Sequence, residues 1–438
     1  MEIFSSYNVI IGISITIILS FIFNGVAKKT NVPAVLLLIV LGIILQYILK
    51  AFGVGDAINF FPMLEVLGIV GLIMIVLEAA LELELKGDKL IPIVKSFSIA
   101  LLGLVASTFI AAVILKALID GMTMQSAWLY ATPLSILSSA IIIPSVSGLS
   151  DLKKEFHIYE STFSDILGIM LFYFLAGRLN PAEDSGVVGF FLNLILTVVI
   201  SLVVSYAIIL IFQKIKSQVK LFLLIAVLLL LYALGKKMHL SSLIIILIFG
   251  LVIANMKLFF RGKLREYLDL EKAKSIYHEL HVITAETAFV VRTLFFVIFG
   301  ITIVLSSLLS LKVTLISILI LISIYVIRFG LLRLFMGKDI SPQLYIAPRG
   351  LITVLLFYAI PAEATIEGFE PGILLFVIIG TSLIMTGGMI KDKRNSNEEV
   401  VQTEPEEEGE EIEYFMENIT DLNEIEGINP SAEEQEGQ

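Results

Sequence analysis

Cysteine is absent from the 438-residue chain, and histidine occurs only four times. The first absence excludes disulfide bonds and thiolate metal sites, and four scattered histidines offer little for a zinc site. The sequence also shows no nucleophile and base set, no metal-ligand spacing and no phosphate-binding loop. We therefore expect neither an enzyme nor a bound cofactor.

Charge is also scarce, because only 16% of the residues are charged whereas 58% are hydrophobic. A soluble domain is roughly half apolar and a quarter charged. A membrane-crossing helix needs about 20 apolar residues. Thirteen runs of that order are present, near 8–26, 33–49, 64–85, 91–115, 125–148, 156–177, 186–213, 219–235, 239–256, 282–311, 313–335, 341–361 and 371–390. The pattern predicts an all-α polytopic membrane protein with about 13 transmembrane helices.

The Lys and Arg residues of the predicted loops divide unevenly between the two sides of the membrane. With thirteen alternating spans, one side receives 22 cations, Arg328 among them, and the other side receives 6. Positive loops face the cytoplasm, so we expect the N-terminus outside and the C-terminus in the cytoplasm, with the inner membrane of a prokaryotic cell as the location. The two remaining cations, Arg292 and Arg349, fall inside predicted spans.

Two segments differ from the predicted membrane domain of residues 1–390. Residues 257–280 mix apolar residues with charges of both signs, which predicts an amphipathic helix at the cytoplasmic interface. Residues 391–438 form the expected cytoplasmic tail. Its part from Asn395 onward holds sixteen acidic residues and no basic ones, which predicts disorder.

One acidic residue, Asp165, is predicted at the middle of a span. The sixth span lies between Lys154 and Arg178, and their midpoint is position 166. A charge at the bilayer centre costs from roughly 3 to more than 10 kcal/mol, so such residues are kept when paired, hydrated or functional. On a helix, Ser161 and Asp165 are neighbours on one face, whereas Glu160 and Ser164 form a second pair.

Two other spans are predicted to be broken at the depth of Asp165. The fifth span carries Pro133 and Pro144 around Ser135, Ser138 and Ser139, and the twelfth contains the step Pro348-Arg349-Gly350. Broken helices at corresponding places in two halves are typical of transporters built from inverted repeats. The two discontinuous helices are expected to cross at the membrane midplane, where carbonyl and serine oxygens suit a small hard cation.

Several motifs together resemble those of the monovalent cation/proton antiporter superfamily, in its sodium/proton exchanger branch. ESTFSD at 160–165 is similar to the family's EGESLFND-type helix, and IAPRGLITVLL to its LRG helix. RTLFFVIFG is similar to the F-F-x-x-x-G segment, and VPAVLLLIVLGIIL and LGIVGLIMIVLEAALELEL to helices of the first repeat. The resemblance covers residues 1–390 in the family's order.

The resemblance implies roles for individual residues. Asp165 would bind Na⁺ and the proton in turn, and Glu160 would form a structural ion pair with Arg349. Ser161 and Ser164 would be the neighbours of Asp165 in the site. Ser138 and Ser139 of the broken fifth span are further candidate ion ligands through their hydroxyl oxygens. The resemblance further implies a homodimer in the lipid bilayer, in which a core domain shifts against a dimerisation domain. A monovalent cation and the proton are the expected partners, and nucleic acid is not.

Two departures from the family pattern leave the ion and the stoichiometry open. Ser164 stands where the family usually has Asn or Asp, and Ser138-Ser139-Ala140 replaces Thr-Asp-Pro. Sodium/proton antiport is the leading expectation, with potassium/proton antiport and a sensory or channel-like relative without exchange as alternatives. A single titrating carboxylate favours one-for-one, electroneutral exchange.

The role of Arg292 is open from the sequence alone. It follows Glu286 by six residues in the cytoplasmic half of the tenth span. It is a candidate membrane anchor, a partner of Glu286 or an accessory cation of the site, and pairing with Asp165 is the structural alternative to ion binding by that aspartate.

Overall fold

The computed structural model describes residues 6–30, 32–52, 61–83, 85, 89–179, 186–215, 220–237, 242–260, 262–303, 307–308 and 310–393. Within these residues all regular structure is helical, and each of the thirteen predicted spans contains a helix. Nine stretches among them are long and apolar enough to cross a bilayer, if the two half-helices within Met124–Ser145 are counted as one stretch. The predicted acidic tail lies almost wholly outside the described residues.

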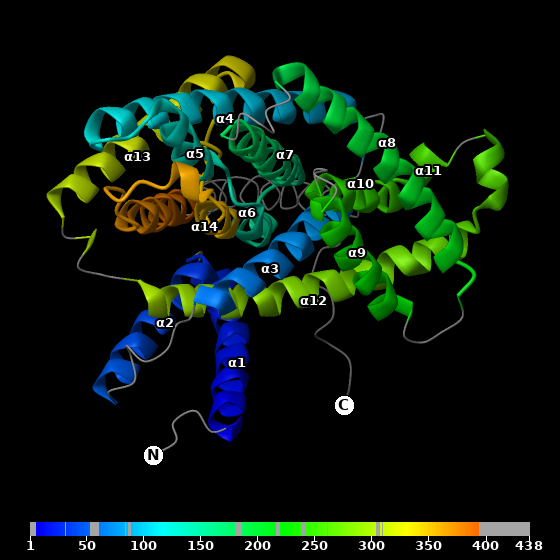
Figure 1. The fold of residues 1–438 in the computed structure, drawn as a ribbon, viewed down its shortest axis with the longest axis horizontal. Helices are drawn as coiled ribbons and strands as arrows, with labels where there is room; N and C mark the ends of the chain where they lie inside the picture. Colours follow the sequence, from blue (N-terminus) through cyan, green and yellow to red (C-terminus); the bar gives the residue numbers. More distant parts are fainter. Residues whose placement is uncertain are drawn as a thin grey trace, which may run out of the picture.

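The first group of helices forms a bundle that we call the scaffold (Figure 1). Its central member is the long helix α12, which packs along α2 and α3, while α10 packs against α3, α8 and α9. In Figure 1, α12 extends from α1 and α2 toward α8 to α11. The scaffold comprises α1 (Ser6–Thr30), α2 (Ala34–Ala51), α3 (Phe61–Glu82), α8 (Gly186–Phe212), α9 (Lys220–Lys237), α10 (Ser242–Ala254), α11 (Met256–Phe259) and α12 (Leu270–Thr302).

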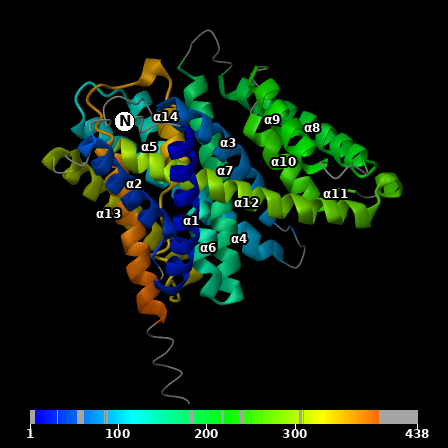
Figure 2. The ribbon, with the colours of Figure 1, turned by 90° about the horizontal axis from the view of Figure 1, so that it is seen from below.

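The second group forms a bundle that we call the core, and it contains both broken helices. Helix α4 packs against α5, α7 and α13, and α14 packs against α5. Helix α3 of the scaffold contacts α7 and α14, so it faces the core directly. The core comprises α4 (Leu90–Leu118), α5 (Met124–Ser135), α6 (Ser139–Ser145), α7 (Asp151–Gly177), α13 (Leu311–Met336), α14 (Leu351–Tyr358) and the last helix, Gly372–Lys393. Figure 2, seen from below, shows α8 to α11 of the scaffold to the right of the core helices, with α1, α2 and α12 in front of the core.

Small residues let the scaffold helices approach closely. A Cβ added at Gly42 of α2 would lie 2.3 Å from the Val297 carbonyl oxygen, and one at Gly300 of α12 would lie 2.5 Å from the Ile39 carbonyl oxygen. Backbone meets backbone here, so neither position has room for a side chain. Such close contact through glycine is a usual way for membrane helices to pack.

The predicted amphipathic helix over 257–280 is wrong as a continuous element. The chain forms the short helix α11, then a 3₁₀ segment at Gly262–Tyr267, and then α12, which begins at Leu270 and continues without interruption to Thr302. Asp269 caps α12 by accepting a hydrogen bond from the Lys272 backbone N–H at 3.2 Å. No proline occurs between Leu270 and Thr302, and buried Ile276 and Leu280 continue the apolar stripe into the span.

Candidate functional site

The two discontinuous segments cross inside the core and bond to each other. Helix α5 ends at Ser135 and α6 begins at Ser139, and residues 136–138 between them are non-helical, with Ile136 and Ser138 in the extended conformation. Residues 346–350 are also non-helical, and α14 follows them. The Ser138 backbone N–H donates to the Pro348 carbonyl oxygen at 3.0 Å. The predicted breaks and their crossing are therefore confirmed, although Pro133 and Pro144 lie within the half-helices.

Gly350 permits the close approach at this crossing. An added Cβ there would lie 2.5 Å from Ser138 Oγ and 2.9 Å from Ile141 Cδ1. We expect Gly350→Ala to lower the free energy of unfolding by about 1–3 kcal/mol, as overpacking does, and to slow transport. Thermal unfolding in detergent and vesicle flux measure the two effects. Gly330→Ala on α13, where an added Cβ meets nothing within 4 Å, is the control, and equal effects of the two changes would contradict the prediction.

Asp165 lies on α7 against the break between α5 and α6, and its side chain is 2% exposed. Its Oδ2 accepts hydrogen bonds from the Ser139 hydroxyl and from the Ser139 backbone N–H, the latter at 3.3 Å. Its Oδ1 has no hydrogen-bond partner among the described residues. No arginine is hydrogen-bonded to this carboxyl in the described chain, so the structural alternative of a pair with Arg292 is not seen. One oxygen is hydrogen-bonded, and the other, which we call open, is buried without a hydrogen-bond partner among these residues.

The remaining serines of the predicted site have different partners. The Ser164 hydroxyl accepts a hydrogen bond from the Leu137 backbone N–H at 3.0 Å, so it holds the extended segment in place. The Ser161 hydroxyl donates to the His157 carbonyl oxygen of its own helix at 2.7 Å. Ser138 Oγ is buried at the crossing without a hydrogen-bond partner among the described residues. Among the residues that the structure describes, Ser139 alone contacts the Asp165 carboxyl through hydrogen bonds.

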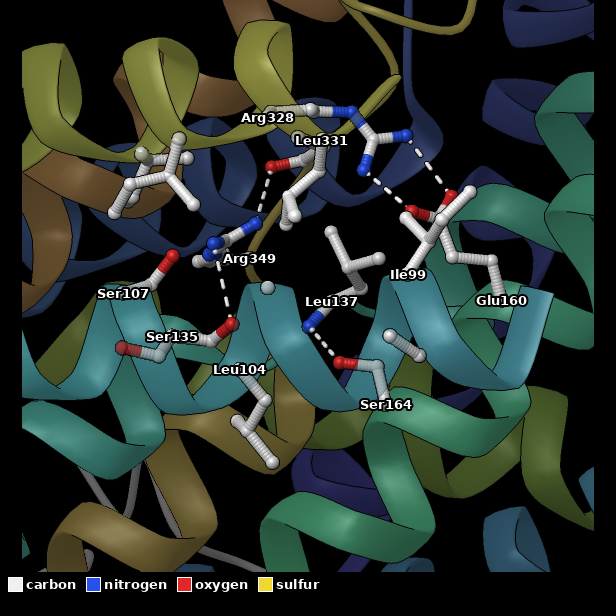
Figure 3. Close-up of a pocket in the computed structure, with 15 residues that line it drawn as sticks. Ile99, Leu104, Ser107, Ser135, Leu137, Glu160, Ser164, Arg328, Leu331 and Arg349 are labelled. Carbon is white, nitrogen blue, oxygen red and sulfur yellow. Dashed lines mark hydrogen bonds and ion pairs between the residues drawn. The ribbon is translucent and has the colours of Figure 1, made fainter. Parts of the chain in front are cut away.

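The expected ion pair between Glu160 and Arg349 is wrong, because Arg328 of α13 takes the carboxylate instead. Arg328 Nη1 lies 2.7 Å from Glu160 Oε1, and Arg328 Nη2 lies 2.9 Å from Glu160 Oε2 (Figure 3). Arg328 Nε also donates to the Gln343 carbonyl oxygen at 2.9 Å. The geometry is bidentate, which is the strongest form of this contact. A cavity of about 30 Å³ lies between this pair and Ser164.

Arg349 instead binds main-chain oxygens at the end of a half-helix. Its Nε donates to the Leu134 carbonyl oxygen at 2.9 Å, and its Nη2 to the Ser135 carbonyl oxygen at 3.2 Å. Both carbonyls belong to the last turn of α5, where no further helical N–H is available to them. The guanidinium thus satisfies the C-terminus of α5 and compensates its negative dipole end.

The predicted place of Arg328 is wrong as well. The loop-charge pattern counts it among the cations of the cytoplasmic loops, but it lies inside α13 and not in a loop, and it is only 7% exposed. A signal was present, because Arg328 precedes the end of the predicted span at 335 by seven residues. Glu160 is buried too, at 1% exposed, so each member of the pair requires the other.

Arg292 and Glu286 both lie on α12, and the structure separates their surroundings. Arg292 Nη1 donates to the Ala140 carbonyl oxygen of α6 at 3.1 Å, so its guanidinium extends from the scaffold to the core. Glu286 has an exposed side chain. No ion pair joins Arg292 and Glu286 in the part of the chain that the structure describes.

A cavity of about 610 Å³ lies between the two bundles, close to the Asp165 site. Its walls come from α1, α2 and α12 on the scaffold side, and from α6 and the last helix on the core side. It reaches Ala140 and Ile141, which follow Ser139 directly. Asp392 and Lys393 line it as well, and the loop-charge pattern places these two residues on the cytoplasmic side.

These features together define a class of membrane protein. Two broken helices that cross in a helical bundle, beside a buried carboxyl group with an open oxygen, are typical of secondary transporters. The sequence profile described as "Sodium/hydrogen exchanger, transmembrane" matches residues 14–391. The chain therefore belongs to the sodium/hydrogen exchanger family, which is a family of cation/proton antiporters and not of enzymes.

Solved structures agree with this assignment at the level of the fold. The chain is similar to the structure at pH 8 of the sodium proton antiporter MjNhaP1 from Methanocaldococcus jannaschii, with 21% identity, a TM-score of 0.63 and coverage of 89% of this chain and 99% of that one. It is also similar to the electron microscopy structure of the same antiporter, with 19% identity, a TM-score of 0.62 and coverage of 91% and 98%. No curated protein matches the chain significantly in sequence.

Proposed function

We propose that the protein exchanges Na⁺ for H⁺ across the membrane, with both ions competing for Asp165. The open Oδ1 of Asp165 is the observation that carries this proposal. A carboxyl group can hold a proton or coordinate Na⁺ through the same oxygen atoms, but not both fully at once. Ser139 would orient the carboxyl and add its own oxygen, since its hydroxyl already lies at hydrogen-bond distance from Oδ2.

Coupling between the two ions follows from the cost of burying charge. An ionised, empty Asp165 is unfavourable in the dry core, and either a proton or a sodium ion removes that charge. The other buried charges leave this requirement unchanged, because Glu160 is paired with Arg328 and Arg349 is bound to the end of α5. The core would therefore change its accessibility when loaded and not when empty. One carboxyl gives one-for-one, electroneutral exchange.

The cavity between the bundles would be the cytoplasmic access route. Its lining includes Ala140, the residue that follows Ser139, and we propose that a modest shift of the core against the scaffold opens or closes the path from the cavity to Asp165. We further propose that two chains associate in the membrane, with the N-terminus outside and the C-terminus in the cytoplasm of a prokaryotic cell. Potassium/proton exchange is the alternative for ion identity, because serines 138, 139 and 164 replace the family's usual groups.

Proton release from reconstituted vesicles tests the proposed function. Vesicles carrying a proton gradient and a pH-sensitive dye are given NaCl, KCl, LiCl or choline chloride in turn. We expect Na⁺ to dissipate the gradient, and Li⁺ to do so because its chemistry is close, whereas choline has no effect. A response to K⁺ without one to Na⁺ would replace the proposal by the potassium alternative. No response to any of these cations would contradict the proposal that the protein is an antiporter.

Ser139→Ala is expected to weaken cation binding without abolishing transport. The change removes the hydroxyl on Asp165 Oδ2 but keeps the backbone N–H, and a hydrogen bond to a charged group contributes about 1.5–3 kcal/mol. We expect the apparent KM for Na⁺ to rise by roughly tenfold or more with a smaller change in the maximal rate. Ser145→Ala, whose hydroxyl donates to the Ile141 carbonyl oxygen of its own helix, is the matched control. Equal kinetics for the two variants would show that the Ser139 hydroxyl does not contribute to cation binding.

A further inference from the structure

Pro144 leaves one carbonyl oxygen of the short helix α6 without its normal partner. In an α-helix the carbonyl of residue 140 accepts from the N–H of residue 144. Residue 144 is proline, which has no N–H. The Ala140 carbonyl therefore needs a donor from elsewhere, and Arg292 Nη1 supplies it at 3.1 Å.

The hydrogen bond from Arg292 to Ala140 joins the two bundles. Arg292 belongs to α12 of the scaffold, whereas Ala140 belongs to α6 of the core and is the second residue after Ser138 at the crossing. Both residues line the 610 Å³ cavity. Glu78 of α3, also in the scaffold, lies near enough to Arg292 to attract its guanidinium electrostatically.

We infer that the hydrogen bond between the Arg292 guanidinium and the Ala140 carbonyl is a state-specific contact, which holds the core in the position that leaves the cavity open and breaks when the core shifts. The inference rests on the proposed function, because it assumes that the core moves against the scaffold. Arg292 is then a positioning residue that sets the balance between the two access states. It need not touch the transported ion.

A role for Arg292 through its charge alone explains this arrangement less well than the proposed contact does. An arginine that only repelled cations in the cavity would not need a hydrogen-bond acceptor, and an arginine that only anchored α12 in the membrane would point away from the core. The guanidinium instead meets the one carbonyl of α6 whose helical donor is removed by Pro144. The acceptor and the donor come from different bundles, so relative movement of the bundles must change their separation.

Accessibility of a single cysteine tests the inference, and the chain is suited to this test because it contains no cysteine. Ser145 lines the cavity, and Ser145→Cys places one thiol there. In reconstituted vesicles we expect a membrane-impermeant maleimide to label this thiol from the side to which the cavity opens. Adding Arg292→Gln should slow labelling by roughly tenfold, since a hydrogen bond to a charged group is removed from the open state.

Pro144→Ala provides an independent way to weaken the same contact. Alanine restores an N–H that can bond to the Ala140 carbonyl, so it competes with Arg292 while leaving the arginine in place. We expect slower labelling in this variant too, with a smaller effect than that of Arg292→Gln. In the double variant the two effects should not add, because both act on one hydrogen bond. Additive effects, or a Pro144→Ala variant that labels like the parent, would overturn the inference.

Arg292→Lys separates the contact from the charge. Lysine keeps the positive charge but loses the planar guanidinium. If Arg292 acted only by repelling cations from the cavity, Arg292→Lys would label like the parent and Arg292→Gln would show a lower KM for Na⁺. This pair of results would also overturn the inference. Sodium-driven proton flux of the Ser145→Cys parent is measured in the same vesicles. A parent without flux contradicts the proposed function, whereas a parent with flux and unchanged labelling in Arg292→Gln contradicts only the contact.

Discussion

Asp165→Asn is expected to reduce cation-driven proton flux to the level of vesicles without protein. The amide has nearly the shape of the carboxyl and can still accept the hydrogen bonds from Ser139. It cannot take up a proton near neutral pH, and it carries no charge for Na⁺ to neutralise. Both substrates therefore lose their binding group at once. The measurement is the dissipation of a proton gradient by NaCl in reconstituted vesicles.

The folded state of this variant should be intact or more stable, because a buried ionisable group becomes neutral. Thermal unfolding in detergent checks this point and separates lost chemistry from lost structure. Asp120→Asn is the matched control, since the Asp120 side chain is fully exposed at 104%. Sodium-driven proton flux in Asp165→Asn that exceeds the level of protein-free vesicles would exclude the proposed mechanism.

Glu160→Gln should cause a large loss of stability. The substitution leaves the Arg328 guanidinium buried without its carboxylate, and breaking a buried pair on one side costs about 3–5 kcal/mol. The midpoint of thermal unfolding in detergent should fall clearly. Transport should also decrease, because Glu160 and Asp165 lie on the same helix, α7.

A second substitution shows whether the loss comes from the unpaired charge. Arg328→Met in the Glu160→Gln background removes the charge and should recover part of the stability. Full recovery is not expected, since Arg328 Nε also donates to the Gln343 carbonyl oxygen. Asp339→Asn is the control for an exposed pair, because Asp339 bonds Lys153 at 3.5 Å and is 72% exposed. Such surface pairs contribute about 0–1 kcal/mol. A Glu160→Gln variant as stable as Asp339→Asn would show that the buried pair is dispensable.

The helices of this fold could be predicted from the sequence because the bilayer imposes a length and a composition on each span. The same reasoning located Asp165, since an acid halfway between Lys154 and Arg178 has no ordinary place in lipid. The breaks near Ser138 and Arg349 were predicted from proline, glycine and serine at membrane depth. Each of these signals is local in the sequence, and the structure confirms the spans and the breaks.

Pairings between distant segments could not be predicted in the same way. Glu160 has three buried or half-buried arginines on other elements as candidate partners, namely Arg292, Arg328 and Arg349. The choice among them depends on which helix faces which, and single-sequence patterns do not contain that information. The boundary of α12 was missed for a related reason. A mixed polar and apolar stretch is compatible with an interfacial helix, but it also suits the first turns of a long span whose polar face meets water.

The position of Arg349 has a mechanical consequence. Its backbone N–H donates to Thr381 Oγ1 of the last helix at 3.1 Å, while its side chain is bonded to the end of α5. Arg349 thereby links the non-helical segment before α14 to two other helices of the core. The crossing is held by both helices, which disfavours local opening of the backbone beside Asp165. In the proposed mechanism, an ion bound at Asp165 would therefore move together with the whole core bundle, and not through a local opening of the backbone.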